Sequence, residues 1–180
     1  MNALKGQMFS AELMLAYVIF TIVLVVVVYL WTSTVRDILE SEETYDIEST
    51  AVDVSEGLMR TAGSPEGWDK ENVQAAGLAN GSRNLQKDKI LAFVDLLDVT
   101  KYDNDCPGGI SNYECNKHLT GAGVYDFYLS IEYLNGSIVS DGGTTFVTGK
   151  PPSGDTKKVT MMRTGLLNTT IVRVRVVVWR

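Results

Sequence analysis

Glu12 is the residue of this sequence whose type and position most restrict its chemistry. It is the only acidic side chain before Asp37, and it precedes Leu13–Trp31, a run of nineteen residues with one threonine and no charge. A carboxylate in a membrane helix costs about 2.5–3.5 kcal/mol at the bilayer centre and less at its edge. Glu12 is therefore either a headgroup-level residue without a specific role, or a residue that needs a cationic partner once it is buried.

The rest of the sequence shows no residue set that is typical of catalysis. His118 is the only histidine, no pattern surrounds it, and the chain has neither a G-x-S-x-G motif nor a phosphate-binding glycine loop. We predict a protein that is not an enzyme and that uses no cofactor. The net charge of −6 and the lack of a basic cluster also argue against nucleic acid as a partner.

Four aspartates around Lys101-Tyr102, in the middle of the chain, could supply oxygen ligands to calcium. They are Asp95, Asp98, Asp103 and Asp105. Their spacing does not match an EF-hand loop, and solvated aspartates in turns are far more common, so we predict no metal site.

The two cysteines, Cys106 and Cys115, lie nine positions apart with Pro-Gly-Gly between them. Turn residues in that loop allow the two thiols to meet, and an oxidising compartment would favour a disulfide. Such a short loop should contribute about 2–3 kcal/mol. Two free thiols are the alternative, whereas a zinc site would lack ligands even with His118.

Three Asn-x-Ser/Thr triplets begin at Asn80, Asn135 and Asn168. Such triplets often occur by chance. All three fall in predicted surface turns, which makes them candidate N-glycosylation sites. Asn135 is equally suited to its turn as a turn residue.

A long N-terminal helix must position Glu12. Residues 7–56 contain no Gly and no Pro, so one continuous helix of about 75 Å is expected there. Thr61–Pro65 should end it, because Gly63 and Pro65 are strong helix stops. Beyond the apolar run we expect an apolar stripe to pack on the globular part; it comprises Val35, Ile38, Leu39, Tyr45, Ile47, Val52, Val54, Leu58 and Met59.

The middle of the chain predicts one further helix between irregular segments. Residues 63–84 are rich in Gly and Asn and should form a surface segment anchored only by Trp68. A short helix should follow, with Asn84 as its N-cap. Its expected apolar face comprises Ile90, Leu91, Val94 and Leu97, with Phe93 beside it. Residues 99–123 should be a loop.

Strands are predicted from Gly123 onward. Residues 124–134 alternate between apolar and polar side chains, which indicates a half-buried strand. Asn135-Gly136 favours a two-residue hairpin turn in which both residues have φ > 0. Residues 143–149 suggest a short strand. Residues 157–164 and 169–179 should form a last hairpin around a turn at residues 165–168, with Val172, Val174, Val176 and Val178 on one face and Arg173, Arg175 and Val177 on the other.

These elements predict an α+β fold, in which a long N-terminal helix carries a C-terminal antiparallel sheet of three to five strands. The expected domains are a leader at residues 1–6, the long helix at 7–62 and a globular domain at 63–180.

The first residues resemble the class III prepilin signal of archaeal type IV pilins. The resemblance is carried by Lys5-Gly6-Gln7, Ser10, Glu12 and the apolar helix that follows. GSPEGW, KILAFVDLL, VYDFYLSIEYLNGS and the terminal VRVRVVVW are also similar to archaeal pilin-like proteins. In that family a membrane peptidase cuts just before the helix, which stays on the mature subunit.

The sequence departs from the family pattern in one respect. The family places Gln first, Ser third and Glu fifth after cleavage, whereas a cut after Gly6 makes Gln7 first, Ser10 fourth and Glu12 sixth. A cut after Gln7 restores Ser and Glu but leaves Gln before the bond. We prefer the Gly6–Gln7 bond, because Gly suits a narrow protease subsite.

The resemblance implies a structural pilin of an adhesive extracellular filament, a helical homopolymer joined through its N-terminal helices. Its implied partners are further copies of itself, a prepilin peptidase, an assembly ATPase and a membrane platform protein. Lys5 favours a cytoplasmic N-terminus in the membrane-bound precursor. The alternatives are a minor pilin or pseudopilin, and an uncleaved single-pass anchor that carries a binding domain. A signal peptide cut after Trp31 is disfavoured, because no A-x-A-like site follows.

Overall fold

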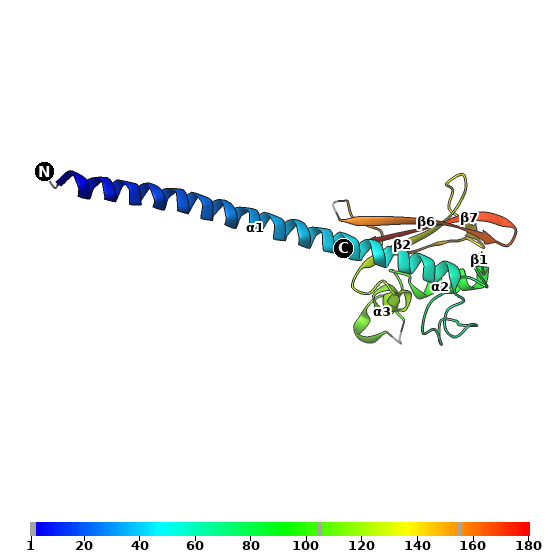
Figure 1. The fold of residues 1–180 in the computed structure, drawn as a ribbon. Coiled ribbons are helices and arrows are strands. Elements are labelled where there is room, and N and C mark those ends of the chain that lie inside the picture. Colours follow the sequence, from blue (N-terminus) through cyan, green and yellow to red (C-terminus); the bar gives the residue numbers. More distant parts are fainter. Residues whose placement is uncertain (1–2, 104–105, 155) are drawn as a thin grey trace. The chain divides into compact units, whose positions relative to one another are not determined.

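Helix α1, Ala3–Arg60, is the first element of the computed structural model (Figure 1). The structure describes residues 3–103, 106–154 and 156–180, and for residues 3–10 and Pro107 it describes the backbone alone. Contacts divide the chain into two units, Met1–Thr44 and Tyr45–Arg180. The predicted helix end is confirmed, because α1 stops at Arg60, just before Gly63 and Pro65.

The first unit is helical throughout residues 3–44. Its side chains are exposed from residue 11 onward, apart from the half-buried Glu43. The predicted stripe is thus unburied at Val35, Ile38 and Leu39, which are 39–61% exposed.

The second unit combines residues 45–60 of α1 with further helices and a sheet. The helices are α2 (Lys87–Leu96), α3 (Asn112–Asn116) and two 3₁₀ turns, η1 (Pro107–Gly109) and η2 (Lys117–Thr120). The strands are β1 (Asn84–Leu85), β2 (Asp126–Tyr133), β3 (Ser140–Asp141), β4 (Thr144–Thr145), β5 (Val147–Gly149), β6 (Lys158–Leu167) and β7 (Thr170–Trp179).

The main sheet has five strands in the order β1-β6-β7-β2-β5, and β3 pairs with β4 separately. β7 is central and antiparallel to both neighbours, with Val176 opposite Leu129 of β2 and opposite Met161 of β6. Only β1 runs parallel to its neighbour, with Leu85 opposite Leu167. The predicted α+β fold with an antiparallel-rich sheet is therefore confirmed.

One face of the sheet builds the core. Residues 45–60 of α1 and helix α2 cover this face (Figure 1) and bury their apolar side chains in the same cluster. The sheet contributes the predicted alternating residues, which are fully buried: Phe127, Leu129, Ile131, Val172, Val174, Val176 and Val178. α1 contributes Ile47, Ala51, Val54, Leu58 and Met59. Tyr45 of the predicted stripe is 71% exposed, so burial of α1 begins at Ile47.

The predicted start of the second helix is wrong. Asn84 lies in β1 opposite Leu166, and α2 begins at Lys87 after Gln86, whose backbone is extended and whose side chain makes no capping bond. The Asn84 carbonyl accepts a hydrogen bond from the Asn80 backbone N–H at 2.7 Å. Pairing with the sheet edge therefore overrides the local preference of Asn for a helix cap.

The buried face of α2 is also rotated from the predicted one. Ile90 and Leu97 are fully buried, but Leu91 and Val94 are only partly buried. Phe93 is fully buried, with its ring centroid 6.5 Å from that of Phe127. Packing of Phe93 on β2 thus sets the orientation of the helix.

Two segments predicted as surface or loop are more ordered than expected. Residues 99–123 contain α3, where the Ser111 hydroxyl accepts a hydrogen bond from the Glu114 backbone N–H. In residues 63–84, Trp68 is buried as predicted, but Ala76, Leu78 and Ala79 are buried as well. These apolar residues stand in an irregular segment without periodicity, so the sequence pattern did not indicate their burial.

Both predicted hairpin turns differ in detail. At Asn135-Gly136 only Gly136 has a positive φ, and the returning chain meets β2 at a single bridge between Glu132 and Ile138. The last hairpin turns at residues 168–169, where Asn168 has φ +56°, because residues 165–167 continue β6.

Candidate functional site

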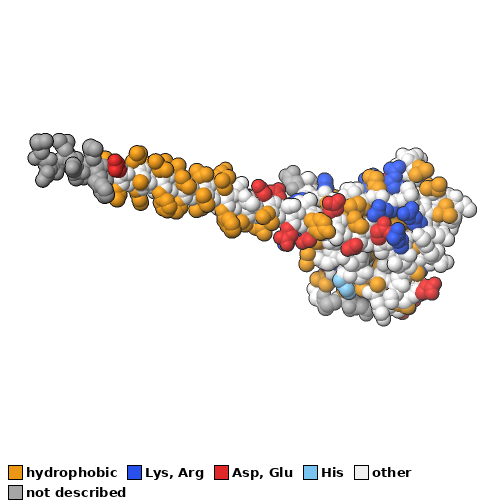
Figure 2. Space-filling view, in the orientation of Figure 1, with side chains coloured by type: hydrophobic (Ala, Val, Ile, Leu, Met, Phe, Trp, Pro, Cys, Tyr) orange, Lys and Arg blue, Asp and Glu red, His pale blue; other side chains and the backbone are white. Residues whose placement is uncertain are grey.

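The apolar segment, Leu13–Trp31 of α1, is the most distinctive surface of the molecule. Each of its large hydrophobic side chains is 48–73% exposed, and they cover the face of the helix that Figure 2 shows. Because these side chains occupy consecutive positions of the helix, they surround it. Among the described residues, α1 is the one helix that is long and apolar enough to cross a membrane. A helix on the surface of a soluble domain would show one apolar stripe instead. This segment is therefore compatible with a membrane anchor or a signal sequence.

The one threonine inside the apolar segment has a hydrogen-bond acceptor within its own helix. Thr21 donates to the Tyr17 carbonyl oxygen at 2.8 Å. Just beyond the segment, Thr32 and Thr34 donate to the carbonyls of Val28 and Leu30, each at 2.9 Å. These local bonds remove polar groups that would otherwise be costly to transfer into an apolar environment.

Glu12 is exposed at the N-terminal end of the apolar segment. Arg36 is the only cationic side chain among residues 11–44, and it lies about 36 Å further along the helix at 1.5 Å per residue. Glu12 therefore has no partner within reach among the described side chains of its own unit. If the segment becomes covered, an unpaired carboxylate is strongly destabilising unless a cation accompanies it.

At the predicted processing site the structure describes the backbone alone. Gly6 and Gln7 belong to helix α1, but their side chains lie outside the described residues.

The predicted disulfide between Cys106 and Cys115 is present, with a Cα–Cα distance of 5.8 Å. It closes a loop that contains η1 and the first residues of α3. The two cysteines are the only ones in the chain, so no free thiol remains.

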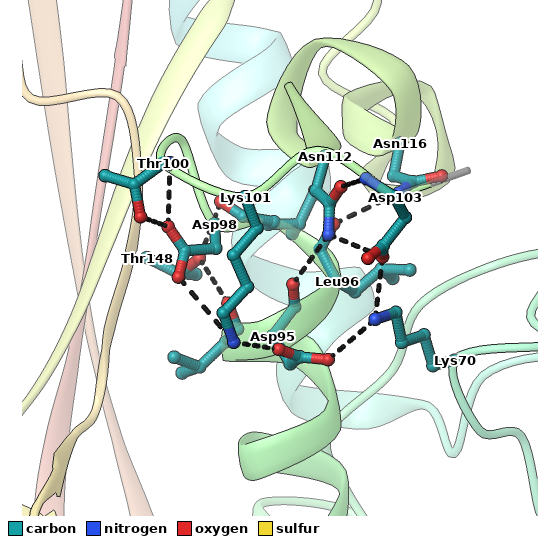
Figure 3. A network of polar contacts seen from close by, with 12 residues as sticks. Lys70, Asp95, Leu96, Asp98, Thr100, Lys101, Asp103, Asn112, Asn116 and Thr148 are labelled. Atoms are coloured by element: carbon teal, nitrogen blue, oxygen red, sulfur yellow. Dashed lines mark hydrogen bonds and ion pairs between the residues drawn. The ribbon is translucent and has the colours of Figure 1, made fainter. Parts of the chain in front are cut away.

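An ion-pair network, which we call the clamp, lies beside this loop (Figure 3). The Lys70 ammonium binds Asp95 at 2.9 Å and Asp103 at 2.7 Å, and Lys101 also pairs with Asp95. Asn112 accepts from the Asp103 backbone N–H at 2.8 Å and donates to the Asp103 carboxylate at 2.7 Å. The clamp thus joins the end of α2 to the loop before the disulfide.

Charge pairing shifts the titration of the clamp. The hydrogen bond from Lys101, followed by that from Lys70, lowers the pKa of Asp95. The hydrogen bond from Lys70 lowers the pKa of Asp103, and the same bonds raise the pKa of Lys70. All three groups are therefore charged at neutral pH.

These pairings bear on the aspartates considered for calcium. Asp95 and Asp103 are bound by lysines, and Asp98 accepts from the Thr100 backbone N–H at 2.8 Å and from its hydroxyl at 2.7 Å. Asp105 lies outside the described residues. Within the described part of the chain, no group of three or more His, Cys, Asp or Glu side chains is placed to hold a metal ion.

Two lysines matter to the structure in ways that the sequence did not indicate. Lys70 is far from Asp95 and Asp103 in sequence, so no local spacing marks the clamp. Lys89 is 7% exposed and donates to the carbonyl of Glu66 at 2.7 Å and to that of Ala62. Burial lowers the pKa of Lys89. His118, in contrast, is exposed, with Nδ1 2.9 Å from the Cys115 carbonyl oxygen.

The three candidate glycosylation sites are all exposed. The Asn135 side-chain oxygen accepts from the Ser137 backbone N–H at 3.0 Å and from its hydroxyl at 2.7 Å, which fixes the turn. Asn80 and Asn168 also lie in turns, and both line the same groove.

Comparison with protein-family models, with curated proteins and with solved structures finds no match to this chain. The assignment of function therefore depends on the apolar segment and on the residues around it.

Proposed function

We propose that the protein is a structural subunit of an archaeal type IV pilus-like extracellular filament. It is first held in the cytoplasmic membrane and then assembles through the apolar segment of α1. The observation that carries the proposal is an apolar surface that surrounds the helix, with the single carboxylate of Glu12 at its N-terminal end. The resemblance of Lys5-Gly6-Gln7, Ser10 and Glu12 to an archaeal prepilin signal supports it. The role is structural and uses neither catalysis nor a cofactor.

The apolar segment can be kept from water in two different environments. In the membrane, lipid chains surround the apolar segment; in a filament, the segments of neighbouring copies replace the lipid. Apolar surface kept from water is worth about 25 cal/mol per Å². With more than a dozen large side chains exposed, the segment has a strong tendency to remain in one of these two environments and not in water.

Glu12 would give the assembly its register. Cleavage after Gly6 or Gln7 frees an α-amino group on each subunit, and this cation can pair with Glu12 of a neighbour. A well-aligned pair offsets part of the cost of burying both charges, whereas a misaligned neighbour leaves both unpaired. The carboxylate therefore favours one alignment of helices, which apolar contacts alone would not select.

The second unit supports an extracytoplasmic location. A disulfide is typical of oxidising compartments, and the exposed Asn80, Asn135 and Asn168 would be accessible to glycosylation there. In this proposal the partners are a prepilin peptidase, an assembly ATPase, a membrane platform protein and other copies of the chain.

The test is to shear filaments from cells that make the protein, identify their main component and measure its intact mass. We expect this chain, shortened by six or seven residues, as the main component. An uncut chain found only in the membrane fraction would indicate a single-pass anchor for a binding domain. A cut chain present at trace level in filaments of another protein would indicate a minor pilin.

A further inference from the structure

The second unit contains a polar groove that the proposed assembly does not use. It has a volume of about 530 Å³ and lies where the turn at Asn80, strand β1, the start of α2 and the β6–β7 turn come together. β1 and the start of α2 lie near the end of α1 (Figure 1). Its volume falls within the range of sites for small ligands, about 300–1,000 Å³.

Four carboxamide side chains line this groove: Asn80, Asn84, Gln86 and Asn168. None of them forms a side-chain hydrogen bond with another described residue, although their backbones are held by the fold. For example, the Gln86 backbone N–H donates to the Leu78 carbonyl at 2.9 Å. Each carboxamide offers two donors and one acceptor oxygen. The groove thus presents four unused groups that can donate and accept at once.

The charges of the groove favour a neutral ligand. Lys87 is the only cation among the described residues that line it, and its ammonium is paired with Asp141 at 2.7 Å. Asp88 is the remaining charged residue that lines it. A phosphate or another anion would therefore meet no free cation and one carboxylate, whereas hydroxyl groups can donate to Asp88 and exchange hydrogen bonds with the amides.

A smaller hollow of about 230 Å³ adjoins the groove and shares Lys87 and Asn168 with it. Tyr133 lines this hollow and is 38% exposed. An exposed aromatic ring can pack against the apolar face of a pyranose ring, while carboxamides bind its hydroxyls. Apolar or aromatic contact combined with a few placed polar groups is the usual composition of a ligand site.

We propose that this groove binds a neutral carbohydrate. In chains that carry no glycan at Asn80 and Asn168, the four carboxamides hold its hydroxyl groups, and Tyr133 contacts an adjoining sugar ring. The proposal does not depend on filament assembly, because every residue of the site belongs to the second unit.

The test uses the full-length chain, made in a host without N-glycosylation so that Asn80 and Asn168 carry no glycan. The chain is kept in a detergent without a sugar headgroup and titrated with a panel of neutral mono- and oligosaccharides and with inorganic phosphate. We expect saturable binding of at least one neutral sugar and none of phosphate. The double variant Asn84→Ala/Gln86→Ala should weaken that binding at least tenfold, and it alters no glycosylation triplet.

Gln74→Ala is the matched control, because Gln74 is an exposed carboxamide outside the groove. It should change binding by less than twofold, and both variants should keep the wild-type melting temperature. The proposal is overturned if no neutral sugar binds, if phosphate competes, or if the double variant binds like wild type. None of these outcomes affects the filament test, which measures assembly.

Discussion

The two units of this chain hold their structure by opposite means. In residues 11–44 nearly every side chain is exposed, and the threonine hydroxyls donate to carbonyl oxygens of the preceding turn of the same helix. In residues 45–180 a sheet and two helices enclose a shared core, and a disulfide and ion pairs join segments that are distant in sequence. The first unit must therefore obtain its packing from its surroundings, whereas the second supplies its own. Substitutions of the same kind should thus have different consequences in the two units.

The largest effect is expected from Glu12→Gln, measured as filament yield against the amount of membrane-bound precursor. The precursor should still insert into the membrane, because removal of a charge makes insertion easier. If the proposed filament forms, its yield should fall at least tenfold, because the amine of the neighbouring subunit would lose its counter-charge in an apolar bundle.

Glu48→Gln is the matched control, because it removes the same charge from an exposed position of α1 in the second unit. It should leave filament yield unchanged. Equal yields for wild type and Glu12→Gln, with normal processing, would show that Glu12 makes no essential pair between subunits.

A phenylalanine truncation in each unit tests the comparison directly. Phe127 is fully buried, so Phe127→Ala should lower the free energy of unfolding of the second unit by about 3–5 kcal/mol. Phe20 is 63% exposed, so Phe20→Ala should leave that free energy unchanged. Thermal unfolding in detergent, followed by near-ultraviolet circular dichroism, measures both. Equal destabilisation by the two variants would contradict the view that only the second unit has its own core.

Regular periodicity explains what the sequence could predict. A local stop signal marks the end of α1. A local alternation of side chains marks the buried face of β2 and the four inward valines of β7. Glu12 and the apolar segment could be recognised for the same reason, because charge and hydrophobicity are local properties.

The features that the sequence missed depend on long-range contacts. Asn84 is a good N-cap in isolation, but pairing with Leu166 draws it into a strand. Lys70 reaches Asp95 and Asp103 only because the fold brings distant segments together, and no spacing in the chain marks that contact. The carboxamide groove likewise combines residues from three separate parts of the chain.

The disulfide should contribute less than the core. Reduction of Cys106–Cys115, or the double variant Cys106→Ser/Cys115→Ser, should lower the free energy of unfolding by about 2–3 kcal/mol, as expected for a short closed loop. Hydrogen exchange should quicken in residues 106–120 but not in β2 or β7, because those strands are held by the core and by each other. Faster exchange throughout the sheet would show that the loop supports the whole second unit.

The smallest effect is expected from the clamp, and its sign depends on pH. The pKa values of Asp95 and Asp103 are lowered in the folded state. Their stabilising contribution is therefore complete above the ordinary aspartate pKa of about 3.9. This contribution is lost as the pH falls through the lower folded-state pKa values. Lys70 has a raised pKa, so its contribution persists to high pH and is lost only as the pH rises through its folded value. Wild-type stability should therefore decrease as the pH falls below about 4. The free energy of unfolding of Lys70→Met should be slightly lower than that of wild type at pH 7. The loss should be smaller than that from removal of the disulfide, because these side chains are partly exposed. The stability of this variant should also decrease less on acidification.

The control is Lys158→Met, which removes an exposed lysine that is no part of the clamp and should keep the wild-type pH dependence. If Lys70→Met and Lys158→Met unfold alike at every pH, the clamp does not stabilise the loop.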